Sequence, residues 1–266
     1  MIEFERAITR TPGSTFADGI TPGLLGRADV SLAQEQHRGY IAALEKCGVE
    51  VITLEADDAH PDSCFVEDPA IVNDRVAVIT APCKPSRQGE EALIRPVIES
   101  IYGSHVEQIE RPGTLEGGDI CRVDEHYLIG ISDRTNENGA QQLADILKKY
   151  GFTSEFVDMR IPTRQHILHL KTGMTYLGEN VMLLCPALAD DPVFEKYEKI
   201  LTDEDDAYAV NVIPVNGHVI MAKGFEKTAG KLRAAGYDVI EIPVTEFEKQ
   251  DGGLTCLSLR IPKLRF

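Results

Sequence analysis

The sequence predicts an α/β fold in which five units, each made of two strands, a helix and a further strand, close into a propeller-like ring. Patterns typical of β-hairpins recur along the chain, and most of them are followed by a helical segment and another strand. Corresponding positions also recur at a regular interval. With positions 67, 116, 169, 211 and 256 as references, the intervals are 49, 53, 42 and 45 residues.

Four segments have the pattern of a β-hairpin, in which a tight turn joins two short apolar strands. The turn residues are Asn-Asp, Asp-Glu, Glu-Asn or Asn-Gly, which suit the backbone angles of such turns. The predicted hairpins cover residues 65–82, 115–132, 168–186 and 209–225.

Helical segments and strands follow these hairpins. The pattern of apolar residues predicts helices in 89–103, 136–151 and 225–236, which are followed by the strands 105–110, 153–159 and 237–244. The corresponding segment of the fourth unit, 192–203, fits the pattern less well.

The first predicted unit needs both ends of the chain. A helix in 31–48 and a strand in 49–56 lack a preceding hairpin. The strand 4–10 and a C-terminal strand around Cys256, where apolar residues alternate, would supply it by pairing with each other. A layered α/β sheet is the other architecture that this order of elements allows.

Composition limits the classes of function. The 266 residues include 43 acidic and 27 basic side chains, a net charge of −16, which disfavours nucleic acid and anionic membranes as partners. The chain lacks a signal-peptide pattern and any apolar run near the length of about 20 residues that spans a membrane, so we expect one cytoplasmic domain, residues 1–266. The six cysteines include no Cys-x-x-Cys pair, and we expect free thiols and no metal site.

The repeat places a set of reactive side chains in corresponding turns and strand starts. They are Glu67, Asp68, Glu116, Asp119, His169 and Cys256. A ring would bring them to its axis, where cysteine and histidine supply a nucleophile and a proton shuttle. Neighbouring carboxylates raise the pKa of a thiol, but they suit a planar, cationic guanidinium as substrate.

These residues also have structural interpretations. Acidic residues are frequent in turns, and Cys256 could be a small apolar side chain of the core. His169 could be a core histidine, and its neighbour His166 competes with it for the role of proton shuttle. The joint placement of the set in the repeat favours the catalytic interpretation.

Five motifs resemble those of the dimethylarginine dimethylaminohydrolases, a family of the guanidine-modifying pentein superfamily. They are FVEDPA, TLEGGD, SDRTNENGAQQLADIL, LHLKTG and DGGLTCLSLR, in the family's order and across nearly the whole chain. The resemblance implies the pentein fold, a five-bladed ββαβ α/β-propeller with pseudo-fivefold symmetry and a central active site. It also implies hydrolysis of Nω-methylated L-arginine to L-citrulline and a methylamine, without a metal or organic cofactor.

The resemblance assigns catalytic roles to four residues. Cys256 matches the family's nucleophile and His169 its general acid and base. Glu116 and Asp68 match the carboxylates that face the guanidinium.

Other matches surround the expected substrate pocket. Phe65 and Glu67 match residues that line it, and Asp62 matches a contact near the α-amino group. Arg87 and Arg134 match a clamp for the α-carboxylate, a role for which the planar arginine fork is well suited.

The segment STFADGIT resembles a mobile lid, with Ile20 where bacterial members commonly carry leucine. The expected partner is a small cationic amino acid, and a homodimer is an open option. Arginine deimination and amidino transfer are rival reactions, since the same catalytic groups serve them. A non-catalytic ligand-binding propeller is the rival from another class, and the intact catalytic set argues against it.

Overall fold

The computed structural model describes residues 2–164 and 167–266, and its strands form five sheets of three strands each. The strands are β1 Phe4–Arg10, β2 Glu50–Leu54, β3 Ala70–Val72, β4 Ala77–Ile79, β5 Val106–Gln108, β6 Ile120–Val123, β7 His126–Ile131, β8 Thr153–Asp158, β9 Met174–Gly178, β10 Val181–Leu184, β11 Glu198–Leu201, β12 Ile213–Val215, β13 His218–Ala222, β14 Asp238–Ile242 and β15 Leu259–Pro262.

All five sheets have the same topology. Their strand orders are β15-β1-β2, β3-β4-β5, β6-β7-β8, β9-β10-β11 and β12-β13-β14. In each, the middle strand is antiparallel to one neighbour and parallel to the other. A tight turn can join antiparallel neighbours, whereas parallel neighbours need a longer crossover. Five such sheets confirm the predicted ring of repeated units.

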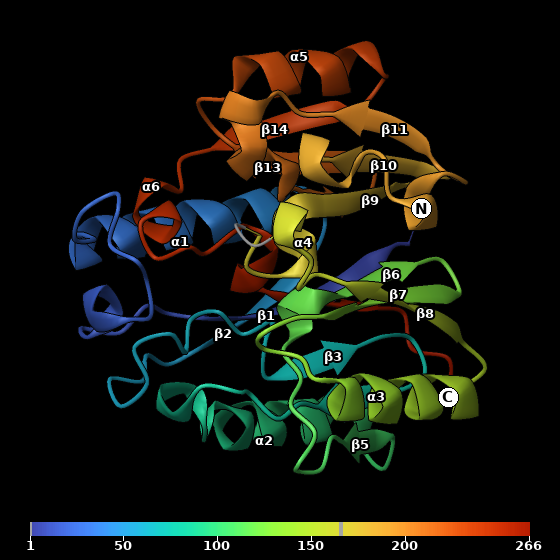
Figure 1. Cartoon of the computed structure of the whole chain (residues 1–266). Helices are drawn as coiled ribbons and strands as arrows, with labels where there is room; N and C mark the ends of the chain where they lie inside the picture. Colours follow the sequence, from blue (N-terminus) through green and yellow to red (C-terminus); the bar gives the residue numbers. More distant parts are fainter. Residues whose placement is uncertain (1, 165–166) are drawn as a thin grey trace.

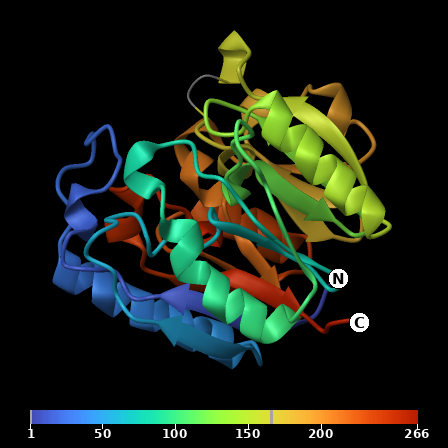
Figure 2. The same ribbon diagram turned by 90° about the horizontal axis from the view of Figure 1, so that it is seen from below.

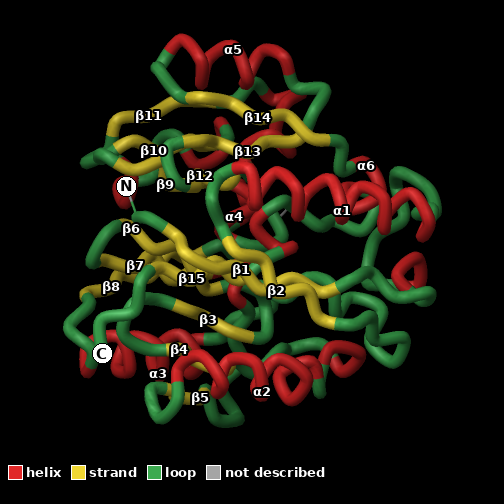
Figure 3. Tube along the Cα trace, turned by 180° about the vertical axis from the view of Figure 1, so that it is seen from behind, coloured by secondary structure: helices red, strands yellow, loops and turns green. Residues whose placement is uncertain are grey.

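Helices of two or more turns lie on the outside of the ring. They are α1 Val30–Lys46, α2 Glu90–Tyr102, α3 Glu137–Lys149 and α5 Glu226–Ala234. Figure 1 shows these helices around the strands, and Figure 3 shows the same arrangement from behind. Seen from below, α2 and α3 cover the near side of the molecule (Figure 2). Two shorter α-helices, α4 Leu170–Gly173 and α6 Thr245–Glu248, and several 3-10 helices are also present.

Local sequence explains where the helices and turns form. The side chains of Asp29 and Asn136 accept hydrogen bonds from backbone N–H groups in the first turns of α1 and α3, at 3.0 and 2.8 Å. In the predicted Asn216-Gly217 turn, both residues have positive φ, 45° and 88°, which Asn and Gly adopt at low cost. All four predicted hairpins are present.

The crossover of the fourth unit differs from the others. It contains two one-turn 3-10 helices, Pro186–Leu188 and Pro192–Phe194, the second followed closely by β11, and no α-helix. Proline at the first helical position and the Asp191 side chain, which accepts from the N–H of Val193, stabilise the second turn. A proline begins each of the two turns, and because proline inside a helix removes a hydrogen bond and clashes with the preceding turn, the two prolines disfavour a longer helix between β10 and β11.

The predicted strand around Cys256 begins later than expected. Cys256 lies in a one-turn 3-10 helix, Thr255–Leu257, and β15 starts at Leu259. Such a short turn does not change the alternation of apolar residues enough to be visible in sequence. The predicted pairing of the two chain ends is confirmed, because β15 is antiparallel to β1 from Phe4↔Pro262 to Ile8↔Leu259.

Hydrogen bonds between successive units surround the axis of the ring. Five of them close the circle: Gly118 N to Asp68 Oδ1 at 2.9 Å, Leu170 N to Asp119 Oδ1 at 3.1 Å, Asn211 Nδ2 to Lys171 O at 2.9 Å, Thr255 N to Asn211 Oδ1 at 2.9 Å and Glu67 N to Cys256 O at 3.1 Å. These bonds hold the inner turns that carry the predicted site residues.

In the part of the chain that the structure describes, no helix has the length and apolar character needed to cross a bilayer.

Candidate active site

The inner turns enclose a pocket at one end of the ring axis. Eight of the ten predicted site residues line it: Ile20, Asp62, Phe65, Asp68, Arg87, Arg134, His169 and Cys256. The structure therefore brings together residues from segments that are distant in sequence. Glu116 lies beside this pocket, in contact with His169 and Arg134, and Glu67 lies elsewhere.

Cys256 is presented by its 3-10 turn. Its backbone N–H donates to Gly253 O at 3.2 Å, and its carbonyl accepts from Glu67 N at 3.1 Å. Burial, together with the carboxylates of Glu67 and Asp68, raises the pKa of the thiol to about 12. At neutral pH Cys256 is consequently a neutral thiol.

His169 precedes α4 and is buried, with 6% of its surface exposed. Its Nε2 lies 3.0 Å from Oε2 of Glu116. Burial opposes protonation of the ring, but the charges of Asp119, Glu116 and Asp68 outweigh it and raise the pKa of His169 to about 9. At neutral pH the ring is an imidazolium that can donate a proton.

Asp68 is held by a buried ion pair with Arg87. Its Oδ2 lies 2.5 Å from Nη1 of Arg87, and its other oxygen accepts from Gly118 N. Burial raises the pKa of Asp68, but Arg87 and His169 outweigh burial and lower it to about 2. Asp68 is therefore a carboxylate that faces the pocket.

Arg87 has little hydrogen-bonding capacity left for a ligand. Its Nε and Nη2 both donate to the Glu90 carboxylate, at 3.0 and 2.7 Å, and Nη2 also donates to Phe65 O at 3.2 Å. This differs from the expectation of a free clamp for an α-carboxylate. In the structure Arg87 is the counter-charge of two buried carboxylates, Asp68 and Glu90.

Arg134 is less fully engaged. Its Nη1 donates to Glu116 Oε2 at 3.1 Å, and within the described ranges its Nε and Nη2 have no hydrogen-bond acceptor. The other oxygen of Glu116 accepts from the backbone N–H of Cys83 at 3.1 Å. The ion pair leaves Arg134 with donors for an anionic group in the pocket.

Asp62 connects the pocket to the expected lid. The backbone N–H of Ile20 donates to its carboxylate at 3.1 Å, and burial raises the pKa of Asp62. Ile20 itself is 37% exposed at the edge of the pocket. Gly19 permits this contact, because a Cβ at that position would lie 2.5 Å from Oδ1 of Asp62.

Glu67 does not line the pocket with Phe65. Its carboxylate contacts Lys171, Thr255 and Arg260 on the opposite side of the inner turns. Glu67 and Asp68 lie in a turn before β3, and their neighbouring side chains line different cavities, so Asp68 and Glu67 face opposite ends of the axis. The expected role of Glu67 in the substrate pocket has no support in this geometry.

Two pairs of glycines allow the inner turns to pack closely. A Cβ on Gly118 would lie 2.6 Å from Nδ1 of His169, and one on Gly252 would lie 2.2 Å from the Phe65 ring. Gly117 and Gly253 would likewise meet Glu67 O at 2.0 Å and the Asn211 side chain at 2.4 Å. A side chain at any of these four positions would overlap a neighbouring residue. This explains why the EGGD and DGGL motifs carry glycines.

The sequence interpretation missed several residues that complete the site. Asp119, which the repeat grouped with the acidic residues but to which no role was given, accepts from Ser132 Oγ at 2.7 Å and from Leu170 N, and so fixes the turn after His169. Leu168, Gln250 and Asp251 also line the pocket. Their nearness in sequence to His169 and Cys256 was the available signal. His166, the predicted competitor of His169, lies outside the described residues.

One group of side chains has the spacing of a metal site. Single ligand atoms of Asp68, Glu116 and His169 lie within 4.8 Å of one another, and all three residues are buried. Their hydrogen bonds are directed to Arg87, Arg134 and one another. With a protonated His169, this set is arranged for a hydrogen-bonded cation rather than for direct coordination.

Comparisons with known proteins agree with this geometry. A family model described as arginine deiminase matches residues 58–209. The N(G),N(G)-dimethylarginine dimethylaminohydrolase of Pseudomonas aeruginosa is 42% identical over 97% of this chain and 99% of that protein. A protein of the same name from Streptomyces coelicolor is 31% identical over 98% of both.

Solved structures give the same result. The P. aeruginosa enzyme, as a cysteine-to-serine mutant complexed with citrulline, matches with a TM-score of 0.94 over 97% of this chain and 99% of that one. A histidine-to-glycine mutant described as an adduct with S-methyl-L-thiocitrulline gives 0.93 with the same coverage. The N-terminal domain of the cyanobacterial arginine dihydrolase ArgZ, 24% identical, shares the fold with a TM-score of 0.87 over 99% of this chain and 100% of that one. With its sequence, its fold and the geometry of its inner turns in agreement, the chain belongs to the dimethylarginine dimethylaminohydrolase family.

Proposed function

We propose that this protein hydrolyses Nω-methylated L-arginine, monomethylarginine or asymmetric dimethylarginine, to L-citrulline and methylamine or dimethylamine. The observation that carries the proposal is the group formed by the half-buried Cys256 and the buried His169, Asp68 and Glu116 at one end of the axis. A thiol beside an imidazolium and two carboxylates suits attack on a cationic carbon that carries an amine leaving group. The names of the similar enzymes support this substrate class.

Binding sets the charges for the reaction. Asp68 and Glu116 accept hydrogen bonds from the planar nitrogens of the guanidinium, which places its carbon near Cys256. The positive charge of the substrate then offsets the carboxylates that raise the thiol pKa, and the thiol loses its proton to solvent. The nucleophile is thereby formed when its substrate is present.

The first half-reaction breaks the bond to the methylated nitrogen. The Cys256 thiolate attacks the guanidinium carbon, and a C–S bond forms. His169 gives its proton to the methylated nitrogen, the C–N bond breaks, and the amine leaves. An S-alkylthiouronium intermediate remains on Cys256.

The second half-reaction restores the enzyme. Neutral His169 takes a proton from a water molecule, whose oxygen attacks the same carbon. The C–S bond breaks, the thiolate leaves, and the second proton of the water passes from the oxygen to solvent, which leaves the neutral urea group of citrulline. His169 has regained its proton and can begin the next cycle.

The rest of the pocket would bind the amino-acid end of the substrate. Arg134 has donors for the α-carboxylate, and Asp62 carries a negative charge for the α-amino group. Arg87 has the second clamp position in the family match, and its ion pairs with Asp68 and Glu90 would have to rearrange for that role. Phe65 and Ile20 supply apolar surface at the edge of the pocket.

A substrate panel tests the proposal directly. The purified protein is incubated with arginine, monomethylarginine, asymmetric dimethylarginine and agmatine, and both the ureido product and the released amine are measured. We expect amine and citrulline from the methylated arginines. Ammonia from arginine would favour a deiminase, transfer to an added amine would favour an amidinotransferase, and binding without product would favour a ligand-binding propeller.

Labelling gives an independent test of the nucleophile. A haloacetamidine, which mimics the guanidinium, should modify Cys256 before the other five cysteines, because Cys256 is the one cysteine of the six that lines the pocket with Asp68 and His169. Equal modification of all six would contradict a special role for this thiol.

The remaining expectations are predictions as well. We propose that residues 1–266 act as one catalytic domain without a metal or organic cofactor, and that the protein is cytoplasmic. A homodimer is tested by analytical ultracentrifugation.

A further inference from the structure

A second cavity lies on the ring axis, at the end opposite the Cys256 pocket. Its volume is about 170 Å³, well above the 10–15 Å³ that a single water needs by the same measure. The first strands of the units, β3, β6, β9, β12 and β15, lead away from the catalytic turns and supply its walls. No residue is shared between the linings of the two cavities.

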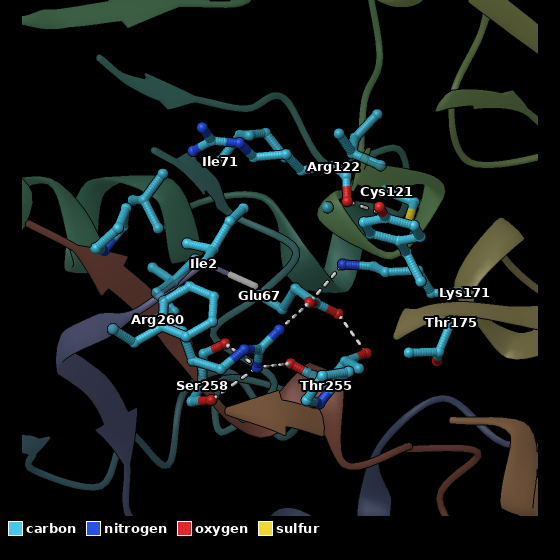
Figure 4. Close-up of a pocket in the computed structure, with 18 of the residues that line it drawn as sticks. Ile2, Glu67, Ile71, Cys121, Arg122, Lys171, Thr175, Thr255, Ser258 and Arg260 are labelled. Carbon is cyan, nitrogen blue, oxygen red and sulfur yellow. Dashed lines mark hydrogen bonds and ion pairs between the residues drawn. The ribbon is translucent and has the colours of Figure 1, made fainter. Parts of the chain in front are cut away.

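Three charged side chains meet at the floor of this second cavity. The Glu67 carboxylate contacts the Lys171 ammonium and lies 3.3 Å from Nη2 of Arg260 (Figure 4). Its other oxygen accepts from Thr255 Oγ1 at 2.8 Å. Two cations thus share one carboxylate, which leaves a net positive charge at the floor.

Arg260 retains the capacity to bind an anion. Its Nη1 donates to Thr255 O, Ser258 O and Ser258 Oγ, at 3.2, 3.1 and 2.9 Å, and its Nη2 donates to Glu67. Nε has no acceptor among the residues that the structure describes. Because the side chain is only 15% exposed and lines the cavity, a ligand would reach these donors through it.

The other charged groups at this cavity are already partnered. Arg122 forms an ion pair with Asp74 at 2.7 Å, and Asp124 accepts from the Tyr176 hydroxyl at 2.7 Å. The hydroxyl leaves the Asp124 carboxylate charged, but Asp124 is exposed and solvent screens its charge, whereas Glu67, Lys171 and Arg260 at the floor are largely buried.

The walls above the floor are mainly apolar. They include Phe4, Ile71, Ile120, Val212, Pro214 and Leu259. A cavity with an apolar wall and a small number of fixed polar groups is typical of small-molecule sites. The combination fits a molecule with one negative charge and a short aliphatic body.

We propose that this cavity binds a small aliphatic monocarboxylate, with its carboxylate on Arg260 and Lys171, and that its occupancy alters the reactivity of Cys256. The coupling follows from three pairs of close neighbours in sequence. Thr255 precedes Cys256, Glu67 precedes Asp68, and Lys171 follows His169 by two residues. Arg260 holds the carbonyl of Thr255, so an anion that draws on Arg260 acts on the turn of the nucleophile.

The charge of the ligand gives the direction of this effect. Lys171 lowers the pKa of Cys256, whereas Glu67 raises it. An added carboxylate beside Lys171 and Arg260 offsets the first influence and favours the neutral thiol. Occupancy should consequently slow alkylation of Cys256.

Calorimetric titration with 3-methylbutanoate tests binding without any need for turnover. We expect binding to the wild type, and no measurable binding of 3-methylbutanamide, which has the same shape without the charge. Arg260→Gln should weaken binding by about tenfold or more, as expected for a lost charged hydrogen bond. Arg265→Gln is the matched control, since Arg265 pairs with Asp74 and does not line the cavity, and it should bind as the wild type does.

Two further variants test the two cavities separately, and they show whether lost binding results from a folding defect. Val72→Phe fills the second cavity without changing a charge and should also weaken binding, whereas Arg134→Ala changes the catalytic pocket and should leave binding intact. Equal binding of acid and amide, loss of binding in Arg134→Ala, or no binding by the wild type would overturn the site. An unchanged rate of Cys256 alkylation with the ligand bound would overturn the coupling. None of these readouts depends on the proposed hydrolysis, so each proposal can fail alone.

Discussion

The two ends of the ring axis are built from the same short segments but have different chemistry. Asp68, His169 and Cys256 face one cavity, while Glu67, Lys171 and Thr255 face the other. The catalytic end contains carboxylates that carry their own arginine partners and a histidine held in the protonated form. At the floor of the other end, the Glu67 carboxylate is shared by two cations, Lys171 and Arg260.

This difference shows how short turns around one axis can direct two different sets of charged side chains into two separate cavities. A displacement of one or two residues along an inner turn moves a side chain from one cavity to the other. Hydrogen bonds around the axis, in which backbone N–H groups donate to the side chains of Asp68, Asp119 and Asn211, hold these turns in place. Variants of neighbouring residues can therefore test each end alone.

The largest expected effect separates Cys256 from Thr255. Cys256→Ser should reduce turnover by about 10⁴-fold or more, because it removes the nucleophile, as in other enzymes that act through a single one. Thr255→Ser keeps the hydroxyl that donates to Glu67 and should change kcat by a small factor. Steady-state assays and thermal melts of both proteins check this. Comparable losses in the two variants would mean that the two ends are not chemically distinct.

A glycine variant tests how closely the catalytic end is packed. Gly118→Ala places a methyl group 2.6 Å from Nδ1 of His169 and should lower kcat by about 10²-fold through displacement of the ring. Gly39→Ala, in α1, meets no atom within 4 Å and should leave kcat unchanged. Similar kcat values for the two alanine variants would show that the position of His169 is not critical.

The two arginines of the catalytic end should give different kinetic defects. Arg134→Ala should mainly raise KM for methylated arginine, by about tenfold to a hundredfold, because a charged hydrogen bond to the α-carboxylate is lost. Arg87→Ala should also lower kcat, since Asp68 loses the ion pair that holds it. Measurement of both parameters, with agmatine as a substrate lacking the carboxylate, separates the two roles. Efficient use of agmatine by the wild type would show that the clamp is misassigned.

The smallest expected effect concerns the charge state of the resting enzyme. With the pKa of Cys256 near 12 and that of His169 near 9, the pair at pH 7 is a neutral thiol beside an imidazolium. The rate of alkylation by iodoacetamide should rise with pH from neutrality upward, because the thiolate fraction increases about tenfold per pH unit below the pKa.

A small, non-reacting guanidinium ion at a non-denaturing concentration should increase this rate severalfold at neutral pH, since it lowers the thiol pKa. The ligand must leave the sulfur accessible to the reagent. A thiolate already formed well below pH 7 in the free enzyme would contradict substrate-assisted activation and would assign activation of the thiol to His169.

Much of the ring could be predicted because each hairpin depends on local turn chemistry. Asn216-Gly217 and Glu179-Asn180 adopt the positive φ angles that a tight turn requires. The fourth crossover was harder to predict, since Pro186 and Pro192, and not its apolar pattern, disfavour a longer helix there. The 3-10 turn at Cys256 has the same apolar alternation as a strand, and a single turn gives no periodic signal of its own.

The site could be predicted as a set of residues, but not as a set of contacts. Motif matches placed Cys256, His169 and Asp68 at one pocket, and the structure brings them together. The direction of Glu67 and the ion pairs of Arg87 depend on which groups become neighbours across units, which a single sequence does not contain. The second cavity was missed for the same reason, because its lining comes from all five units.

The pairing of β1 with β15 has a consequence for the newly synthesised chain. The unit that carries Cys256 is assembled from two strands that lie far apart in sequence, and β1 is synthesised long before β15. While the ribosome adds the intervening residues, β1 has no antiparallel partner and its edge stays open to incorrect pairing. The catalytic cysteine also leaves the ribosome late and reaches its position only as the ring closes. A partly translated chain therefore lacks the arrangement that attacks a guanidinium, and the activity appears only after the fold is closed.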